Sequence, residues 1–442
     1  MNHPAALSPP ATLANRVSEL WPPRATDASP FGCEVCGWAA SGAMDLTGPA
    51  GGPPDISPAP AFARLGEVLS LLARTTAALG RAVRLAPGAV LTARAVDHGF
   101  RRAGTRSAGG STRLLRTADG WCALTLSRAD DIAAVPAIIG AHRTGDHWKA
   151  LAHFAVDVSA ADLADRAQLL GVPAAALPPG GPKADPGTPP WQLSRLAAPA
   201  PWRDLTGRLV VDLSSMWAGP LCAHILGRAG ARVIKVESPH RPDGARADHH
   251  FFDTLHAGHE FRTVDFRTDS GRDELAALLA AADIVIEASR PRALAQLGLG
   301  PDRRGLRPGQ IWVGLTGYGR SEPMRVAFGD DAAVAGGLVG TGHGMPVFCA
   351  DAIGDPLSGI AAALAVCAAV RAGGGVLADV SMRAVTAAFA AAPPRCAGPH
   401  RVFTHDGRWQ VRCAHTGRTQ AVLSPRSAQT HAESAFPGGV AC

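Results

Sequence analysis

Arg208-Leu-Val-Val-Asp-Leu213 and Arg232-Val-Ile-Lys-Val-Glu237 decide the fold of this chain. Both segments are short and apolar, as is typical of strands buried on both faces of a sheet. Between them, Trp217-Ala-Gly-Pro220 opens a helical pattern that ends at Gly230. This strand, helix and second strand predict a right-handed βαβ unit.

The same alternation continues toward the carboxyl end. A helical pattern covers residues 272–281, and strand patterns follow at 283–287, 311–316 and 376–380. Strands that alternate with helices favour a parallel sheet, because each helix returns the chain to the edge where the next strand begins. We therefore predict an α/β fold with a Rossmann-like, doubly wound parallel sheet over residues 203–423.

Smaller units flank this domain. Asp119-Gly120 predicts a hairpin turn between two short strands, and helical patterns at 129–139, 146–154 and 159–170 complete a small α+β domain over residues 101–173. The remaining units are a flexible arm (1–30), a partial repeat (31–100), a Pro/Gly-rich linker (174–202) and a frayed tail (424–442), with a closing hairpin predicted between 409–412 and 420–423.

The most apolar helix pattern of the chain follows Ala350-Asp-Ala-Ile-Gly-Asp-Pro-Leu-Ser-Gly359. Pro356 suits the first helical position, which predicts that Asp355 is the N-cap. A structural cap is one interpretation. The other is a carboxylate kept ionised at the positive end of a buried helix, where it can act as a nucleophile.

Residues 31–100 repeat the order of features around Asp355. Thr47-Gly48, a pair of prolines and a helical pattern over 61–79 parallel Thr341-Gly342, Met345-Pro346 and the helix after Asp355. Matching Gly66 to Gly359 places Phe62 where Asp355 stands, so the first copy lacks the carboxylate.

Charge and composition limit the classes of ligand that the chain is expected to bind. The chain has 442 residues, a net charge of +6 and one tyrosine, and its positive charge is almost all arginine. These charges are spread out and not interleaved with aromatic residues, which disfavours nucleic acid and leaves a small anionic ligand as the better expectation. The amino end lacks the basic start and apolar core of a leader peptide, and no uninterrupted apolar run is long enough to span a membrane. We expect a cytoplasmic protein without a membrane partner.

The cysteines predict no metal. There are nine, an odd number without regular spacing, which fits a reducing compartment. Cys33-Glu-Val-Cys36 is a single Cys-x-x-Cys pair with no second pair and no histidine at ligand spacing behind it. Two ordinary cysteines in a loop are therefore favoured over zinc.

A dinucleotide is also disfavoured. Glu237 ends the second strand, where a nicotinamide enzyme keeps its ribose-binding acid, but the first strand-to-helix turn lacks G-x-G-x-x-G. Pro220 also removes an amide that would face a pyrophosphate.

Seven motifs follow one another between residues 204 and 382. They are Asp204-Leu-Thr-Gly-Arg-Leu-Val-Val-Asp-Leu213, Trp217-Ala-Gly-Pro220, Gly230-Ala-Arg-Val-Ile-Lys-Val-Glu237, Ala282-Asp-Ile-Val-Ile-Glu287, Leu315-Thr-Gly-Tyr-Gly319, Asp355-Pro-Leu-Ser-Gly359 and Ala378-Asp-Val-Ser-Met382. Together and in this order they resemble the class III, or CaiB/BaiF-type, CoA-transferases, the group of formyl-CoA transferase, carnitine CoA-transferase and α-methylacyl-CoA racemase. The small domain precedes the large one here, whereas in that family it usually follows.

The resemblance implies an acyl-CoA:carboxylate CoA-transferase, working as an interlocked homodimer with coenzyme A as substrate and no permanently bound cofactor. Asp355 matches the catalytic aspartate, which passes through an aspartyl anhydride and an aspartyl-CoA thioester. Gly109 and Gly110 match a glycine-rich loop over the site, with a plain hairpin as the alternative. Trp217, Ala218 and Gly219 match positions at the thioester end of CoA.

The chain departs from the family near the CoA phosphates. Where an asparagine and a lysine are usual, the sequence reads His256-Ala-Gly-His-Glu-Phe-Arg262. The predicted anionic contacts are therefore Lys235, Arg241, Arg246 and Arg262, with solvated surface arginines as the alternative.

Two other functions stay open. A racemase or isomerase acting on an acyl-CoA needs a base, and Gly329-Asp330-Asp331 offers aspartates where that branch has a histidine. A non-catalytic relative that binds acyl-CoA or a partner would fit the repeat without a carboxylate.

Overall fold

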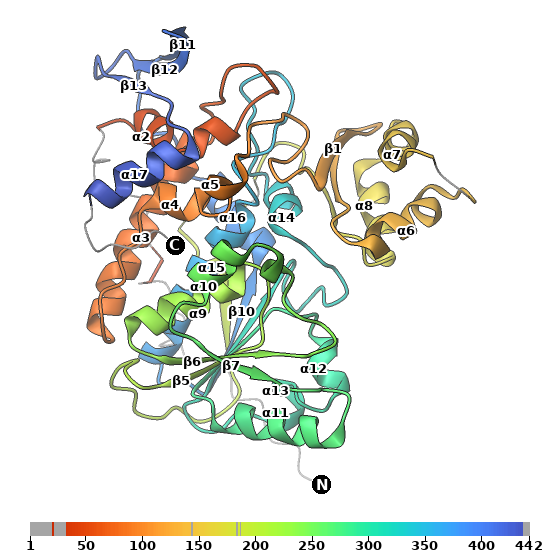
Figure 1. Cartoon of the computed structure of the whole chain (residues 1–442), viewed down its shortest axis with the longest axis vertical. Coiled ribbons are helices and arrows are strands. Elements are labelled where there is room, and N and C mark those ends of the chain that lie inside the picture. Colours follow the sequence, from red (N-terminus) through yellow and green to blue (C-terminus); the bar gives the residue numbers. More distant parts are fainter. Residues whose placement is uncertain (1–19, 22–31, 143–144, 183, 186, 436–442) are drawn as a thin grey trace.

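A seven-stranded sheet forms the centre of the computed structural model, which describes residues 20–21, 32–142, 145–182, 184–185 and 187–435 (Figure 1). Its strand order is β4-β10-β9-β8-β5-β6-β7, and every neighbouring pair is parallel except β4 with β10. The strands are β4 (Trp191–Arg195), β5 (Leu209–Asp212), β6 (Arg232–Glu237), β7 (Glu260–Thr263), β8 (Ile284–Glu287), β9 (Ile311–Thr316) and β10 (Val376–Ser381). The mixed α/β fold with a mostly parallel sheet is thus confirmed.

The order of the strands opens a crevice. From β5 the chain runs outward to β6 and β7, then crosses back to β8 and continues to β9 and β10 on the other side. The winding direction therefore reverses between β5 and β8. Ligands of such sheets bind beyond the carboxyl ends of the strands at this point.

Helices cover both faces of the sheet (Figure 1). On one face lie α9 (Ala218–Ala229) and α15 (Gly354–Arg371), and on the other lie α11 (Asp269–Ala281), α12 (Arg292–Gln296) and α13 (Pro301–Arg304). A Cβ atom on Gly359 would lie 2.5 Å from the carbonyl oxygen of Ala218. Glycine is therefore needed where α15 crosses the start of α9.

Helix α15 is the core of the molecule. Its residues are apolar on every side because it packs between the sheet and the amino-terminal helices, and its buried residues share one apolar core with Leu65 and Leu72. Among the described residues it is the one helix long and apolar enough to cross a membrane, but 89% of that window is buried inside the protein, as in a core helix of a globular fold.

The amino-terminal region wraps around this core. It consists of α2 (Glu34–Ala40), η1 (Met44–Leu46), α3 (Ala59–Ala78), α4 (Pro87–Thr92) and α5 (Ala95–His98). Helices α2 and α3 follow one another as α14 (Gly329–Ala335) and α15 do, while the repeat itself stays a prediction. Cys33 immediately precedes α2 and Cys36 lies within it, so the prediction of a loop holds for Cys33 and was wrong for Cys36.

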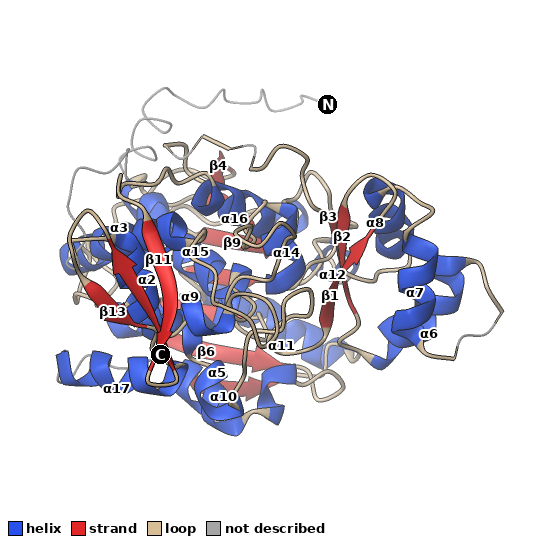
Figure 2. Cartoon of the chain, turned by 90° about the horizontal axis from the view of Figure 1, so that it is seen from above, coloured by secondary structure: helices blue, strands red, loops and turns tan. Residues whose placement is uncertain are grey.

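The small unit stands apart at one side of the molecule (Figure 2). It contains the sheet β1-β2-β3 and three helices around an apolar core of its own. The predicted hairpin is present, with Thr112 paired to Thr125 and Arg116 to Trp121. The elements are β1 (Thr112–Arg116), β2 (Trp121–Thr125), α6 (Ala129–Ile139), α7 (His147–Ala155), α8 (Ala160–Leu169) and β3 (Ala174–Ala176).

Some predicted loops carry secondary structure. The predicted linker contributes β3 and β4, because the edges of β2 and β10 offer unpaired backbone groups to any passing segment. The predicted closing hairpin is a three-stranded sheet of β11 (His400–His405), β12 (Arg408–Cys413) and β13 (Thr419–Ala421), and α17 (Pro425–Ala435) occupies part of the predicted frayed tail. Except for Leu20 and Trp21, the predicted arm falls outside the described residues, as do residues 436–442. The remaining elements are η2 (Gly244–Ala247), α10 (His249–Leu255) and α16 (Met382–Ala390).

Candidate active site

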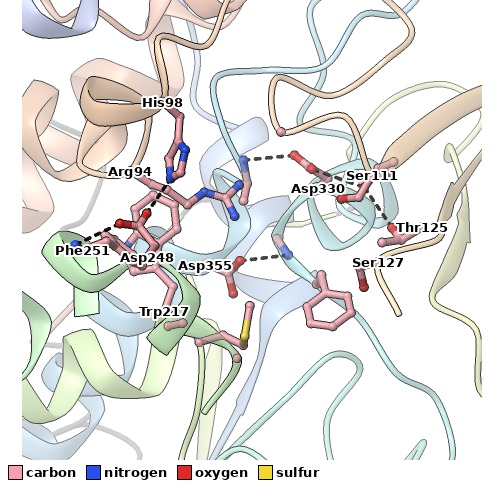
Figure 3. A pocket seen from close by; sticks show the side chains of 18 of the residues that line it. Arg94, His98, Ser111, Thr125, Ser127, Trp217, Asp248, Phe251, Asp330 and Asp355 are labelled. Carbon is pink, nitrogen blue, oxygen red and sulfur yellow. Dashed lines mark hydrogen bonds and ion pairs between the residues drawn. The ribbon is translucent and has the colours of Figure 1, made fainter. Parts of the chain in front are cut away.

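A cavity of about 300 Å³ lies beyond the carboxyl ends of the strands (Figure 3). Trp217 after β5, Asp248 after η2, and Phe328 and Asp330 after β9 form walls of this cavity, and Asp355 lies at the start of α15. The amino-terminal half supplies other walls, through Arg94 and the segments around residues 98–100, 109–112 and 125–127. Both halves of one chain therefore build the site.

Asp355 is the second residue of α15, and the prediction that it is the N-cap was wrong. Ile353 already has helical backbone angles, so the helix begins at Gly354. The Oδ2 atom of Asp355 accepts a hydrogen bond from the backbone N–H of Gly329 at 3.1 Å. A Cβ atom on Gly329 would lie 2.5 Å from this oxygen, so only glycine permits the contact.

The environment of Asp355 raises its pKa to about 7. Burial is the main cause, because a low-dielectric surrounding disfavours the charged form. Arg94 and the N–H of Gly329 lower the pKa, while Asp330 and Asp351 raise it. A carboxyl group with such a pKa changes its charge near neutral pH.

Arg94 is the cation of the site, and the sequence analysis missed it. Its Nε and Nη2 atoms donate to the two oxygens of Asp351 at 2.9 and 2.6 Å, and Asp351 is fully buried. Its guanidinium group also lies 5.8 Å from the centre of the Trp217 ring. No local pattern distinguishes Arg94 from the other arginines, because its partner is 257 positions away.

Asp330 and Asp331 lie side by side at the start of α14 but face different surroundings. Asp330 lines the cavity, accepts from the N–H of Ala352 at 3.0 Å, and has its pKa raised by burial to about 6. Asp331 is fully buried and accepts from Thr125 Oγ1 at 3.0 Å, and burial raises its pKa to about 8. Of the two, only Asp330 faces the space in front of Asp355.

The predicted glycine loop reaches the site. Gly109 lines the cavity, and a Cβ atom there would lie 3.1 Å from Nη2 of Arg94. Gly110 follows in a turn in which its N–H donates to the carbonyl of Ser107, and its φ of 82° favours glycine. The loop thus passes directly over the pair of Arg94 and Asp351.

The motif Trp217-Ala-Gly-Pro forms the amino end of α9 at the cavity wall. Trp217 precedes the helix and packs edge-on against Phe251, with ring centres 5.0 Å apart. Ala218 and Gly219 occupy the first turn, where backbone N–H groups have no partner within a helix, but unlike Trp217 they do not line the cavity. Such an end is a favourable place for developing negative charge.

Of the predicted phosphate contacts, the structure brings none into the cavity wall. Lys235 is fully buried and binds Asp243 at 3.0 Å, so a ligand at the surface could not reach it. Arg246 is paired with Glu237 and lies over Phe252, beside wall residues Gly244 and Ala245. Arg241 and Arg262 are exposed on neighbouring segments.

Residues 205–418 match the model of CoA-transferase family III. This region, slightly less than half of the chain, is similar to that family. The resemblance seen in the sequence is thereby confirmed, and the family III region supplies Trp217, Asp330 and Asp355 to the cavity. Arg94 and Gly109 come from the half of the chain that the family model does not match.

Relatives of the family III region include named transferases. An acyl-CoA transferase of Fusarium pseudograminearum is 35% identical over 204 residues, which are 40% of this chain and 45% of that protein. Succinyl-CoA–D-citramalate CoA-transferase of Chloroflexus aurantiacus is 31% identical over 205 residues, which are 42% of this chain and 51% of that protein. The chain therefore spans about half the length of these curated relatives.

A solved structure of the protein Rv3272 from Mycobacterium tuberculosis is also similar in sequence. It is 31% identical, and the match covers 49% of this chain and 65% of that one. Its TM-score of 0.43 is below the level at which two folds can be equated.

Proposed function

We propose that this protein is an acyl-CoA:carboxylate CoA-transferase with Asp355 as its covalent nucleophile. The observation that carries the proposal is the placement of Asp355. It is a carboxyl group in the first turn of a buried helix, facing a cavity that is also lined by Arg94 and by Trp217, the residue before α9. No permanently bound cofactor is needed, since coenzyme A is itself a substrate.

The reaction proceeds by exchange at two carbonyl groups. An oxygen of ionised Asp355 attacks the thioester carbonyl of the acyl-CoA and expels the CoA thiolate, which forms a mixed anhydride. The thiolate then attacks the aspartyl carbonyl, releases the acyl group as a carboxylate and forms an aspartyl-CoA thioester. The acceptor carboxylate attacks this thioester, and the same steps in reverse give the new acyl-CoA and free Asp355.

Arg94 and α9 supply the electrostatics. Arg94 uses Nε and Nη2 for Asp351, and among the described residues Nη1 has no hydrogen-bond partner, so it can hold an incoming carboxylate. The positive end of the α9 dipole, which lies behind Trp217, favours the negative charge that develops on the attacked carbonyl. Gly109, in the loop over Arg94, limits access of water to the anhydride.

The cavity favours a small acyl group. A volume of about 300 Å³ is at the small end of ligand pockets, and Trp217, Phe251 and Phe328 give it apolar walls. CoA is too large to fit inside, so its nucleotide would extend toward the exposed surface that carries Arg241, Arg246 and Arg262. We keep these three arginines, and not Lys235, as proposed contacts of the CoA phosphates.

We extend the proposal to a cytoplasmic homodimer in which two chains interlock. The eight cysteines within the described residues are all free, which suits a reducing compartment. Measurement of the mass in solution by light scattering tests the dimer, and a monomer would reject it.

A second candidate, an acyl-CoA racemase or isomerase, is favoured by one observation. Asp330 lines the same cavity with a pKa of about 6, which suits a base that removes a proton next to the thioester. In that case deuterium from solvent would enter the α-carbon of an acyl-CoA, and Asp330→Asn would abolish the exchange.

Trapping of the intermediate tests the transferase. The protein is incubated with a panel of short and branched acyl-CoAs, treated with hydroxylamine, and digested for mass spectrometry. We expect a hydroxamate on the peptide that contains Asp355, present in wild type and Asp330→Asn but absent in Asp355→Asn. If no donor gives this product while CoA still binds, the covalent mechanism is wrong, and a non-catalytic acyl-CoA-binding or partner-binding role takes its place.

A further inference from the structure

Four metal-binding side chains from distant parts of the chain meet beside α2. They are Cys33 just before α2, Cys396 in the segment after α16, His400 at the start of β11, and Cys413 at the end of β12. Their Sγ and ring nitrogen atoms all lie within 4.8 Å of one another. None of the four lines the cavity of Asp355.

The distances match a tetrahedral zinc site. With Zn–S bonds of about 2.3 Å and Zn–N bonds of about 2.0 Å, ligand atoms lie about 3.8 Å apart for two sulfurs and about 3.5 Å apart for sulfur and nitrogen. Here Cys396 Sγ and Cys413 Sγ are 3.5 Å apart, and Cys33 Sγ and His400 Nε2 are 3.1 Å apart. We propose that these four residues bind one structural zinc ion. Three thiolates and an imidazole favour zinc over magnesium or calcium.

The surrounding backbone already holds the ligands in place. The carboxylate of Glu34 accepts from the N–H groups of Arg395 at 2.9 Å and Cys396 at 3.4 Å. The N–H of Thr416 donates to Cys413 Sγ at 3.4 Å. His400 is paired directly with Cys413 across β11 and β12. Contacts of this kind orient the first ligands of a metal and tune their affinity.

The zinc ion gives the carboxyl-terminal sheet the anchor that its own residues lack. Within β11, β12 and β13, only Val411 and Cys413 are buried, so apolar packing holds this sheet weakly. The zinc ion would join β11 and β12 to α2, more than 350 positions earlier in the chain. The site would therefore link the segment before α2 to the carboxyl-terminal sheet. It is separate from the cavity of Asp355.

Metal analysis of the full-length protein tests the proposal. We expect one zinc ion per chain after purification, or after removal of metal with a chelator and addition of zinc chloride. Cys396→Ser and Cys413→Ser should lower the zinc content to background. Cys122→Ser is the matched control for Cys413→Ser, because Cys122 is as fully buried as Cys413 but lies in the core of the small unit, and it should keep the zinc.

His400→Cys separates metal binding from a failure to fold. This variant replaces the nitrogen ligand by a fourth thiolate, so it should still bind zinc, and with cobalt in place of zinc its visible spectrum should shift because sulfur replaces nitrogen. Wild-type protein that binds no zinc after addition of the metal would overturn the proposal. So would zinc retained in Cys413→Ser, or a disulfide between Cys396 and Cys413 in freshly purified protein.

Discussion

Replacement of Asp355 by asparagine is expected to abolish transfer and, at the same time, to stabilise the protein at alkaline pH. The folded protein raises the pKa of Asp355 from 3.8 to about 7, mainly through burial. Between these two values the folded state holds a proton that the unfolded chain has released. Its stability therefore falls as the pH rises through this window. Asparagine removes the titrating group but can still accept from the N–H of Gly329.

The size of the effect follows from the shift. A difference of about three pKa units corresponds to about 4 kcal/mol at pH 8, where the group is ionised in both states. Asp355 is only half-buried and faces a cavity, so solvent screens its charge, and we expect about 1–2 kcal/mol. Well below pH 3.8 the carboxyl is protonated in both states, and the gain should vanish.

Thermal unfolding as a function of pH measures the effect. For a unit of roughly 200 residues, about 1–2 kcal/mol raises the Tm by about 2–8 °C. We expect this rise for Asp355→Asn at pH 8, less than half of it at pH 5, and none in Asp157→Asn, where the replaced carboxylate is exposed. If the Tm of Asp355→Asn at pH 8 is equal to or lower than that of the wild type, the reasoning that burial raises the pKa of Asp355 is refuted.

Three further changes test the surroundings of the site. Arg94→Lys keeps a positive charge but loses the two-point contact with Asp351, so we expect the acid limb of the pH–rate profile, near pH 7 in wild type, to move to higher pH; an unchanged profile would contradict the role of Arg94. Gly359→Ala puts a methyl group 2.5 Å from a carbonyl oxygen of α9, and should destabilise the protein by about 1–3 kcal/mol and lower turnover. Gly66 lies in α3, and a Cβ atom added there would have no neighbour within 4 Å, so Gly66→Ala should instead stabilise the protein by about 0.5–1 kcal/mol. The denaturation curves of these two variants should therefore shift in opposite directions. Shifts of the same sign would contradict the close crossing of α15 and α9.

Local patterns predicted much of the sheet and the position of the nucleophile. Strands such as Arg232–Glu237 and Ile311–Thr316 are apolar runs of the expected length, and the turn at Asp119-Gly120 specifies its own hairpin. Asp355 was found through its neighbours Gly354 and Pro356 and through the motif that follows. Each of these features is predicted from a few neighbouring residues, because their backbone preferences and the period of their apolar side chains determine the local structure.

Local patterns did not predict the edge strands and the strands on the surface. Strand β4 has a mixed composition and forms because β10 leaves one edge of the sheet open. Strand β11 alternates weakly and lies on the surface. Their backbone hydrogen bonds depend on what lies beside them, and that neighbour is not encoded in the segment itself.

The sequence by itself therefore determined the α/β class, the family resemblance and the carboxylate at Asp355, because each depends on residues close together in the chain. Only the tertiary structure decided that Arg94 faces Asp355, that Lys235 is buried, and that Cys33 meets Cys413. Lys235 is buried because β6 is an interior strand of the sheet, and its partner Asp243 is only eight positions away. The other two contacts join residues far apart in the chain, and they exist only after packing of α15 against the amino-terminal helices has brought both halves together. Charge, pKa and metal affinity follow from that packing, since each depends on the distance between groups and on their removal from water.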